Sequence, residues 1–320
     1  MRIFPYTFLA FLFLLSCNEN NEQAQEIDKI TIDLIVDRFD VAFSEATEVN
    51  LPKLKAKYPF MFPEKFDDSF WLEQIKDTIQ QELSTETVKK FTSLKTEEDE
   101  IKDLFKHLKY YFPEFKTPRV ITTTSNVDHR NKVIVTDTIT LVSLDTYLGS
   151  DHYFYEGIQE YLRADFNREQ IVVDMAEEYA EKFIFQNNRK RLIDDMIYSG
   201  KVLYFKDRVI PFKTDAQKIS YTTEQLEWAK ANEAYIWSYF VERELLFSTD
   251  TKLANRFINS APFSKFYLEE IDNQSPDKLG QYIGWQIVKS YMENNTVTFK
   301  QLLNKSNDDI FNNAKFKPSR

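Results

Sequence analysis

The chain has 320 residues with 41 Lys or Arg against 51 Asp or Glu, which gives a formal net charge of −10. A nucleic-acid-binding protein usually carries a clustered basic excess, so this composition argues against that class. Only five glycines are present, no glycine-rich phosphate-binding motif occurs, and the single cysteine excludes an intramolecular disulfide and a cysteine-based metal site.

Residues 1–16 have the pattern of a lipoprotein signal peptide. Arg2 precedes an apolar run that reaches Leu15, which is too short for the roughly 20 residues of a membrane-spanning helix. The run ends in the sequence LLSC, which resembles the lipobox of bacterial lipoproteins and predicts cleavage before Cys17. The Cys17 sulfur would then carry a diacylglyceryl group and its freed amine a further chain such as palmitate, which together give stable anchoring. The alternative is an ordinary secretory signal with a chance cysteine.

The polar segment that follows, residues 17–27, is predicted to be the lipidated cysteine and a short flexible tether. Asn18 stands where an Asp would favour retention in the inner membrane. We therefore expect the protein at the outer membrane, facing the periplasm. Residues 28–320 show no linker-like break, and we expect them to form a single α+β domain that is mostly helical.

The first half of this domain is predicted to contain a small antiparallel sheet. Apolar and polar residues alternate over 30–39, and Val, Ile and Thr are enriched over 120–124 and 132–144. Between these strands, helical spacing predicts amphipathic helices over 71–83 and 96–111, with Thr96 as the N-cap of the second. An aromatic loop over 58–62 lies before them.

The second half is predicted to be helical nearly to its end. Apolar stripes at helical spacing cover 169–186, 189–204, 222–246, 250–257, 262–270, 275–293 and 298–304. In the penultimate segment, Gly280 and Gly284 stand one turn apart, where small residues allow a close helix crossing. Lys278 and Gln281 interrupt any apolar span, so we expect a buried intramolecular crossing rather than a membrane dimer.

Few residues are suited to catalysis. The three histidines lie apart in sequence, and neither H-E-x-x-H nor G-x-S-x-G occurs. Asp151, His152 and Glu156 form a polar loop group that could hold a metal or do acid–base chemistry. The carboxylates over 177–181 and at 194–195 could act as an acid–base pair if they were buried together, but a solvated helix face explains them more simply.

Five segments make the chain resemble the GldB family of gliding-motility lipoproteins along nearly its whole length. They are 109–113 (KYYFP), 144–149 (LDTYLG), 152–157 (HYFYEG), 194–201 (DDMIYSGK) and 279–292 (LGQYIGWQIVKSYM). The resemblance implies a cell-envelope lipoprotein needed for gliding, working alongside a machine that secretes adhesins. It implies no enzymatic activity, no cofactor and no metal.

A more distant resemblance is to zincin-type metallopeptidases, which implies a zincin-like domain. On this resemblance, Ala176 and Ala180 would occupy the positions of the two zinc-binding histidines and Ser199 that of the third ligand. Of the catalytic set only Glu177 would remain. A methyl group cannot coordinate zinc, so such a site would hold no metal and could not activate water. Close helix packing explains the two alanines equally well.

Three functions follow as hypotheses. The first is a non-catalytic lipoprotein that supports gliding and the associated secretion through contacts with other envelope proteins. The aromatic segments 58–62 and 147–155 are candidate contact surfaces, with core packing as the alternative for both. The second is a metal-independent or divergent hydrolase that uses Glu177 or the group at 151–156. The third is a peptide-binding module on a degenerate zincin scaffold.

Overall fold

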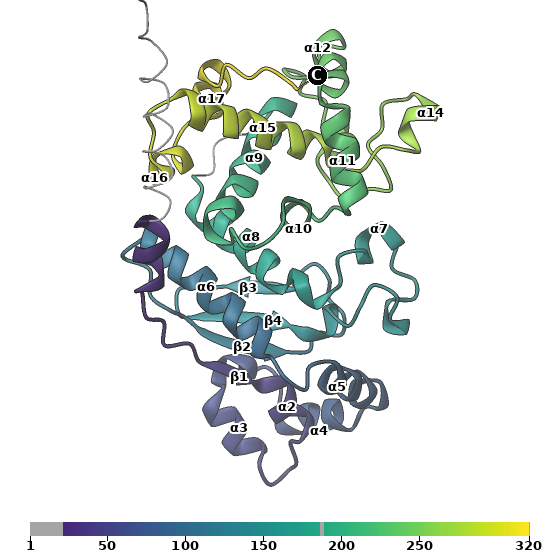
Figure 1. The fold of residues 1–320 in the computed structure, drawn as a ribbon. Helices are drawn as coiled ribbons and strands as arrows, with labels where there is room; N and C mark the ends of the chain where they lie inside the picture. The colour runs from purple at the N-terminus through teal and green to yellow at the C-terminus, as the bar shows by residue number, and fades with distance from the viewer. Residues whose placement is uncertain (1–21, 186–188, 320) are drawn as a thin grey trace, which may run out of the picture.

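The computed structural model describes residues 22–185 and 189–319 (Figure 1). Cys17 and the predicted signal peptide lie outside the described residues. Within the described part of the chain, no helix is both long enough and apolar enough to span a membrane.

A mixed four-stranded sheet lies in the first half of the chain, in the order β1-β2-β4-β3. The strands are β1 (Val36–Arg38), β2 (Arg119–Thr123), β3 (Val133–Val135) and β4 (Ile139–Ser143). β2 pairs in parallel with both β1 and β4, so that Ile121 lies opposite Asp37 on one side and Leu141 on the other. Only β3 and β4 are antiparallel. The α+β class is confirmed, and the small sheet that was expected to be antiparallel is mixed, with β3 and β4 as its antiparallel pair.

The helices divide into a group before the sheet is completed and a group after it. The first group is α2 (Phe39–Ser44), α3 (Leu51–Lys57), α4 (Asp68–Lys76), α5 (Thr78–Lys90) and α6 (Lys95–Tyr111). The second group is α7 (Glu160–Arg163), α8 (Ile171–Phe183), α9 (Leu192–Val209), α10 (Asp215–Ile219), α11 (Thr223–Ala231), α12 (Glu233–Glu242), α13 (Lys252–Phe257), α14 (Glu269–Asp272), α15 (Leu279–Asn294), α16 (Phe299–Leu303) and α17 (Asn307–Asn313).

The two faces of the sheet belong to different hydrophobic cores, because successive strand residues point to opposite faces. Val120 packs into the core that α6, α8 and part of α9 form on one face. Ile121 packs with Phe39, Tyr58 and Phe62 on the other face, under α2 to α4. A third core joins α9 to α11, α12 and α15, at the end of the molecule farthest from α3 (Figure 1). α9 therefore links two of the three cores.

The crossing of α9 and α15 depends on glycine. A methyl group built on Gly284 would lie 1.7 Å from the carbonyl oxygen of Met196 on α9, and one on Gly280 would lie 2.8 Å from the carbonyl oxygen of Phe257 on α13, a second helix that α15 approaches closely. Both glycines are buried within the molecule. The predicted intramolecular crossing is therefore confirmed.

The predicted element boundaries shift in several places. The strand expected over 30–39 is reduced to Val36–Arg38, and α6 begins at Lys95 after an N-cap at Leu94, so Thr96 lies inside the helix. Most of the helix expected over 262–270 is loop, and the sequence analysis missed α17.

Residues 22–28, most of which fall in the predicted tether, are helical. Ile27 is buried, and Gln23 contacts the Tyr111 hydroxyl of α6 and accepts a hydrogen bond of 3.3 Å from Arg208 of α9. This part of the predicted tether therefore packs on the body of the protein.

The two aromatic segments considered as contact surfaces lie mostly in the interior. Tyr58 and Phe62 are buried under the sheet, and Phe60 is the exposed aromatic residue between them. In the second segment, Tyr147 and Tyr155 are fully buried while Tyr153 is exposed. Core packing, the alternative in the sequence analysis, accounts for most of both segments.

Candidate functional site

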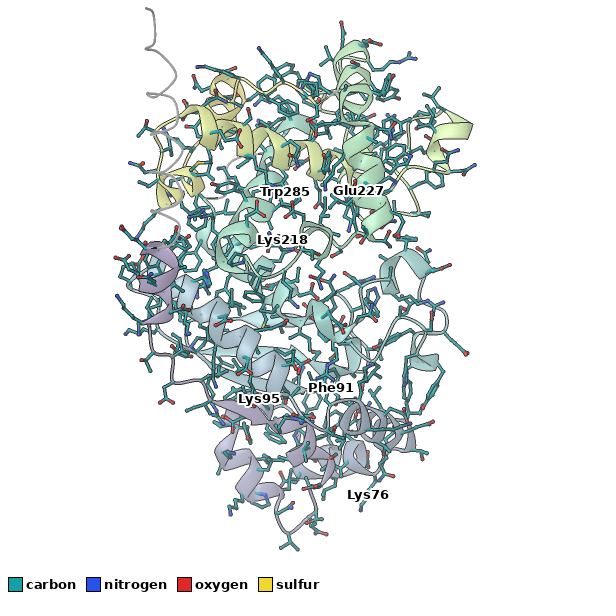
Figure 2. The ribbon with its side chains drawn as sticks, viewed as in Figure 1. Lys76, Phe91, Lys95, Lys218, Glu227 and Trp285 are labelled. Atoms are coloured by element: carbon teal, nitrogen blue, oxygen red, sulfur yellow. The ribbon has the colours of Figure 1, made fainter. Side chains whose placement is uncertain are left out.

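A polar cavity of about 330 Å³ lies between α8, α9, α10 and the start of α15. The loop before β3 and the residues around Asp165 close its other side. Figure 2 labels Lys218 of α10 below Trp285 of α15 in this part of the molecule. Both side chains bind Asp207: the Lys218 ammonium lies 2.9 Å and the Trp285 indole nitrogen 2.7 Å from its carboxylate oxygens. The wall at α10 is thus fixed by polar contacts.

The opposite wall is a stripe of carboxylates on α8. Asp174, Glu177, Glu178 and Glu181 line the cavity at the three-and-four spacing of one helix face. The other face of α8 carries the buried apolar residues, Val173 and Tyr179 among them, that pack on α6 and the sheet. The amphipathic pattern of α8 therefore directs its acids into the cavity.

Buried lysines supply the positive charge of the cavity. Lys206 and Lys218 have side chains only 2% and 7% exposed, and those of Lys132 and Lys278 are mostly buried. An unpaired buried ammonium is costly, so each must be matched by acceptors. Lys218 is held by Asp207 and Asp215, and the Lys278 ammonium donates to the Ile219 carbonyl at 3.0 Å.

Glu177 is paired with Lys206 across the cavity. The two side chains lie 2.7 Å apart, and the Lys206 ammonium also donates to the Lys218 carbonyl at 3.0 Å. The positive charge of Lys206 lowers the pKa of Glu177 below its ordinary value. A carboxylate stabilised in this way is a poor general base near neutral pH.

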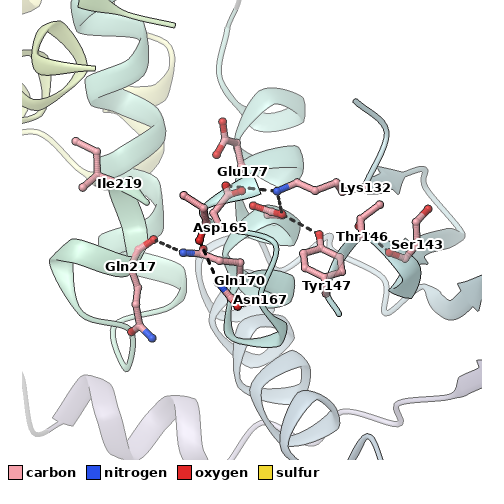
Figure 3. Close-up of polar contacts among 12 residues, drawn as sticks. Lys132, Ser143, Thr146, Tyr147, Asp165, Asn167, Gln170, Glu177, Gln217 and Ile219 are labelled. Atoms are coloured by element: carbon pink, nitrogen blue, oxygen red, sulfur yellow. Dashed lines mark hydrogen bonds and ion pairs between the residues drawn. The ribbon is translucent and has the colours of Figure 1, made fainter. Parts of the chain in front are cut away.

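Lys132 centres a second network at the sheet end of the cavity. Its ammonium lies 2.7 Å from Asp174 and 3.4 Å from Asp165, and the Tyr147 hydroxyl donates to Asp174 at 2.8 Å. Figure 3 shows Lys132 between Asp165 and Tyr147. Burial disfavours the ammonium, but the two carboxylates outweigh it and raise the pKa of Lys132. Two carboxylates therefore share this single ammonium, and one of them also accepts the hydroxyl.

Glu178 and Glu181 are the exceptions, since no hydrogen bond or ion pair joins either side chain to another residue in the described part of the chain. Burial, and then repulsion from Glu181 and Glu177, raises the pKa of Glu178 to about 7. Burial and the charge of Glu177 raise the pKa of Glu181 as well. This wall of the cavity therefore carries two acids without an ion-pair partner in the described part of the chain, and their raised pKa values favour the protonated form.

The positions suggested by the zincin resemblance do not meet in the cavity. Ala176 and Ala180 are fully buried in the hydrophobic core, so a histidine at either position would point away from the cavity. Ser199 and Glu177 do line it. In the described ranges, no group of three or more His, Cys, Asp and Glu is arranged to hold a metal ion.

The loop group at 151–156 does not converge on a site. The Asp151 side chain is 98% exposed and lies 3.9 Å from Arg163, whereas the His152 ring contacts Glu86 of α5 at 3.5 Å. Glu156 is exposed after the turn at Tyr153–Tyr155. None of the three lines the charged cavity.

The buried lysines of the cavity are not recognisable in the sequence, and Asp194 differs from its expected place on a solvated face. Lysine is normally a surface residue, and nothing in the local pattern marks Lys132, Lys206 or Lys218 as buried. Asp194 was assigned to a solvated face but is buried, where it caps α9 and pairs with Arg191 at 2.6 Å.

Fold and cavity together define an α+β protein with a polar cavity lined by buried lysines and by carboxylates. The sequence pattern of the family described as gliding motility protein GldB matches residues 20–318, and the chain belongs to this family. Membership indicates a lipoprotein of the cell envelope with a role in gliding motility. No curated protein and no solved structure is detectably similar to the chain.

Proposed function

We propose that this protein supports gliding motility and the associated protein secretion as a non-catalytic lipoprotein, through contacts with other envelope proteins of that machinery. In this proposal, Cys17 carries the lipid and the protein is held at the outer membrane, facing the periplasm. The ion pair between Lys206 and Glu177 is the observation that supports a non-catalytic role. It places Glu177, the carboxylate that the zincin resemblance suggests for catalysis, 2.7 Å from a buried ammonium, which neutralises it.

Exposed apolar side chains support the contact role. Tyr267, Leu268 and Ile271, at and before α14, are 66%, 43% and 42% exposed. Large apolar residues gathered on a surface often mark an interaction site. α14 stands out from the body on the side away from helix 22–28 (Figure 1).

A paired substitution tests the non-catalytic role against a divergent hydrolase. Glu177→Gln alone leaves the Lys206 ammonium buried without its partner, which costs stability in either case. The double variant Glu177→Gln with Lys206→Met removes the pair as a unit. We expect the double variant to restore stability toward that of the native chain and to support gliding. Loss of gliding in a stable double variant would overturn the proposal and favour a hydrolase.

Two further measurements bear on the proposal. Stoichiometric zinc in protein purified without chelator would contradict the proposal that the protein works without a metal ion. Cys17→Ser is expected to release the protein from the membrane fraction and to give the gliding defect of a strain that lacks the protein. Full gliding with the soluble form would show that the lipid is dispensable.

A further inference from the structure

The chain between helix 22–28 and β1 is strand-like but has no partner strand. We call residues 31–35 the edge segment, because β1, which follows it, is an outer strand of the sheet. The Ile35 carbonyl accepts the Val120 N–H at 3.0 Å. No other backbone group of the edge segment is hydrogen-bonded to a residue in the described part of the chain. Figure 1 shows the edge segment running along the outside of the body, from helix 22–28 to β1.

The side chains of the edge segment alternate between two sides. Ile32 and Leu34 pack against the core that α6 and α8 form, as does Val36 at the start of β1. The residues between them are exposed, and Ile35 is 55% exposed. Alternation with a period of two is the pattern of a β-strand that packs on one face. The edge segment therefore already has the sidedness that pairing with another strand requires.

The pairing with β2 stops at Ile35 because of Pro118, which precedes β2. In the parallel register of β1 and β2, residue 118 would donate its N–H to the carbonyl of Asp33, as Val120 donates to that of Ile35. Proline has no N–H to donate. The next N–H, that of Arg119, is donated to the Thr138 carbonyl at 2.9 Å. β2 therefore cannot continue the ladder along the edge segment.

One edge of this strand faces away from the sheet. Successive strand residues direct their N–H and C=O groups to alternate edges. Since the Ile35 carbonyl points to β2, the groups of Leu34 and Val36 point away from it. Such a row at a sheet edge is a template for a strand from another chain, and proteins often block it with charges or a covering element. The edge segment carries one charge, that of Asp33, which is exposed and has no ion-pair partner in the described ranges.

We propose that the edge segment and β1 bind an extended segment of a partner polypeptide, which adds a strand to the sheet. Only an extended backbone offers donors and acceptors at the two-residue spacing of a strand edge, about 6.7 Å. An acyl chain has no such groups, and a helix uses its own internally. This contact site is additional to the one proposed at α14. It involves neither Glu177 nor Lys206, so the site and the proposed function can fail separately.

The exposed side of the edge segment indicates the composition of the partner segment. Ile35 favours a β-branched residue across from it, and Asp33 favours a basic one, because opposite charges on neighbouring strands stabilise a sheet and like charges destabilise it. Two copies of the edge segment paired at Asp33 would bring two carboxylates together. A β-branched segment with a basic residue therefore fits this edge better than a second copy of the chain does.

Hydrogen exchange followed by mass spectrometry tests the proposal on the full lipidated chain in nanodiscs. The probe is a ten-residue peptide of alternating Thr and Val, with Lys in place of one central Thr. We expect saturating peptide to slow exchange over residues 31–36 at least tenfold and to leave exchange in α14 unchanged. The same peptide with its central amides N-methylated keeps the side chains but loses the donors, and should give no protection.

A charge reversal at an exposed position keeps the test independent of folding. Asp33→Lys should weaken binding of the Lys peptide about threefold and strengthen binding of the matching Glu peptide as much, the size of one cross-strand ion pair. Glu48→Lys, in the exposed turn before α3, is the matched control and should change neither. Exchange over 31–36 that the peptide does not slow would overturn the proposal, as would equal protection by the N-methylated peptide. Protection that rises with protein concentration in the absence of peptide would assign the edge to self-association instead.

Discussion

Gly200 on α9 lies against Gly284 on α15 so closely that a methyl group built on Gly200 would come within 2.3 Å of the Gly284 carbonyl oxygen. Backbone atoms cannot move aside as a flexible side chain can. Gly200→Ala should therefore separate the helices and destabilise the fold by about 3 kcal/mol, the upper range for overpacking. Urea unfolding measures the change. Ser199→Ala, the neighbouring residue on the cavity side, is the control and should cost less than about 1 kcal/mol.

Glu178 should make stability fall as the pH rises from about 4.5 to 7. Its folded-state pKa is raised to about 7, mainly by burial, so over this range the folded protein keeps a proton that the unfolded chain has released. Glu178→Gln removes this dependence. The variant should match the native protein near pH 4.5 and exceed it by roughly 1 kcal/mol at pH 8, after allowance for solvent screening. Glu73→Gln, on an exposed face of α4, changes the charge equally and should show no such divergence.

Lys201 should make the stability of the fold rise with pH above about 8. Its side chain is almost fully buried and donates to the Lys305 carbonyl at 2.5 Å, and burial lowers its pKa to about 8. Between pH 8 and the ordinary lysine pKa near 10.5, the unfolded chain binds the proton that the folded protein has lost, so stability rises with pH. Relative to Lys201→Met, the native protein should gain about 2–3 kcal/mol over this range. Parallel stability curves for the two proteins would refute the assignment.

Asp145→Asn should release the strained loop after β2, in which Asn126 and Val127 both have φ of 59°. The buried carboxylate accepts hydrogen bonds from the N–H groups of Ser125 and Val127. In the variant, the side-chain NH₂ group would replace one carboxylate oxygen and would place a donor against a backbone donor. We expect a loss of about 2–3 kcal/mol in stability and faster hydrogen exchange at the Val127 amide. Asp137→Asn, in an exposed turn, should change neither. Unaltered exchange at Val127 would show that Asp145 does not hold the loop.

The helices could be predicted from the sequence because their apolar spacing is local information. α8 and α9 illustrate this: both follow their predicted apolar stripes to within a few residues. The pairing of the strands could not be predicted in the same way. The composition of Val120 to Thr123 marks a strand, but its parallel pairing with β1 is set by how α2 to α6 carry the chain back across the sheet.

The candidate sites were harder to predict for a different physical reason. A glutamate on a helix and a lysine on another look like surface residues until the fold brings Glu177 and Lys206 together. That the indole N–H of Trp71 has no acceptor can be recognised only when the positions of all neighbouring groups are known. Both features depend on contacts between distant segments, and local spacing does not encode them.

Helix 22–28 limits how far the protein can reach from its membrane. Cys17 precedes Glu22 by five residues, which span at most about 18 Å even when fully extended. In the proposed arrangement with lipid on Cys17, the anchor would hold the body close to the bilayer, with the side that carries helix 22–28 and α16 nearest to it; these two helices lie on the same side of the body (Figure 1). α7 and α14 lie on the other side of the body (Figure 1), so in that arrangement a partner that contacts α14 would approach from the aqueous side.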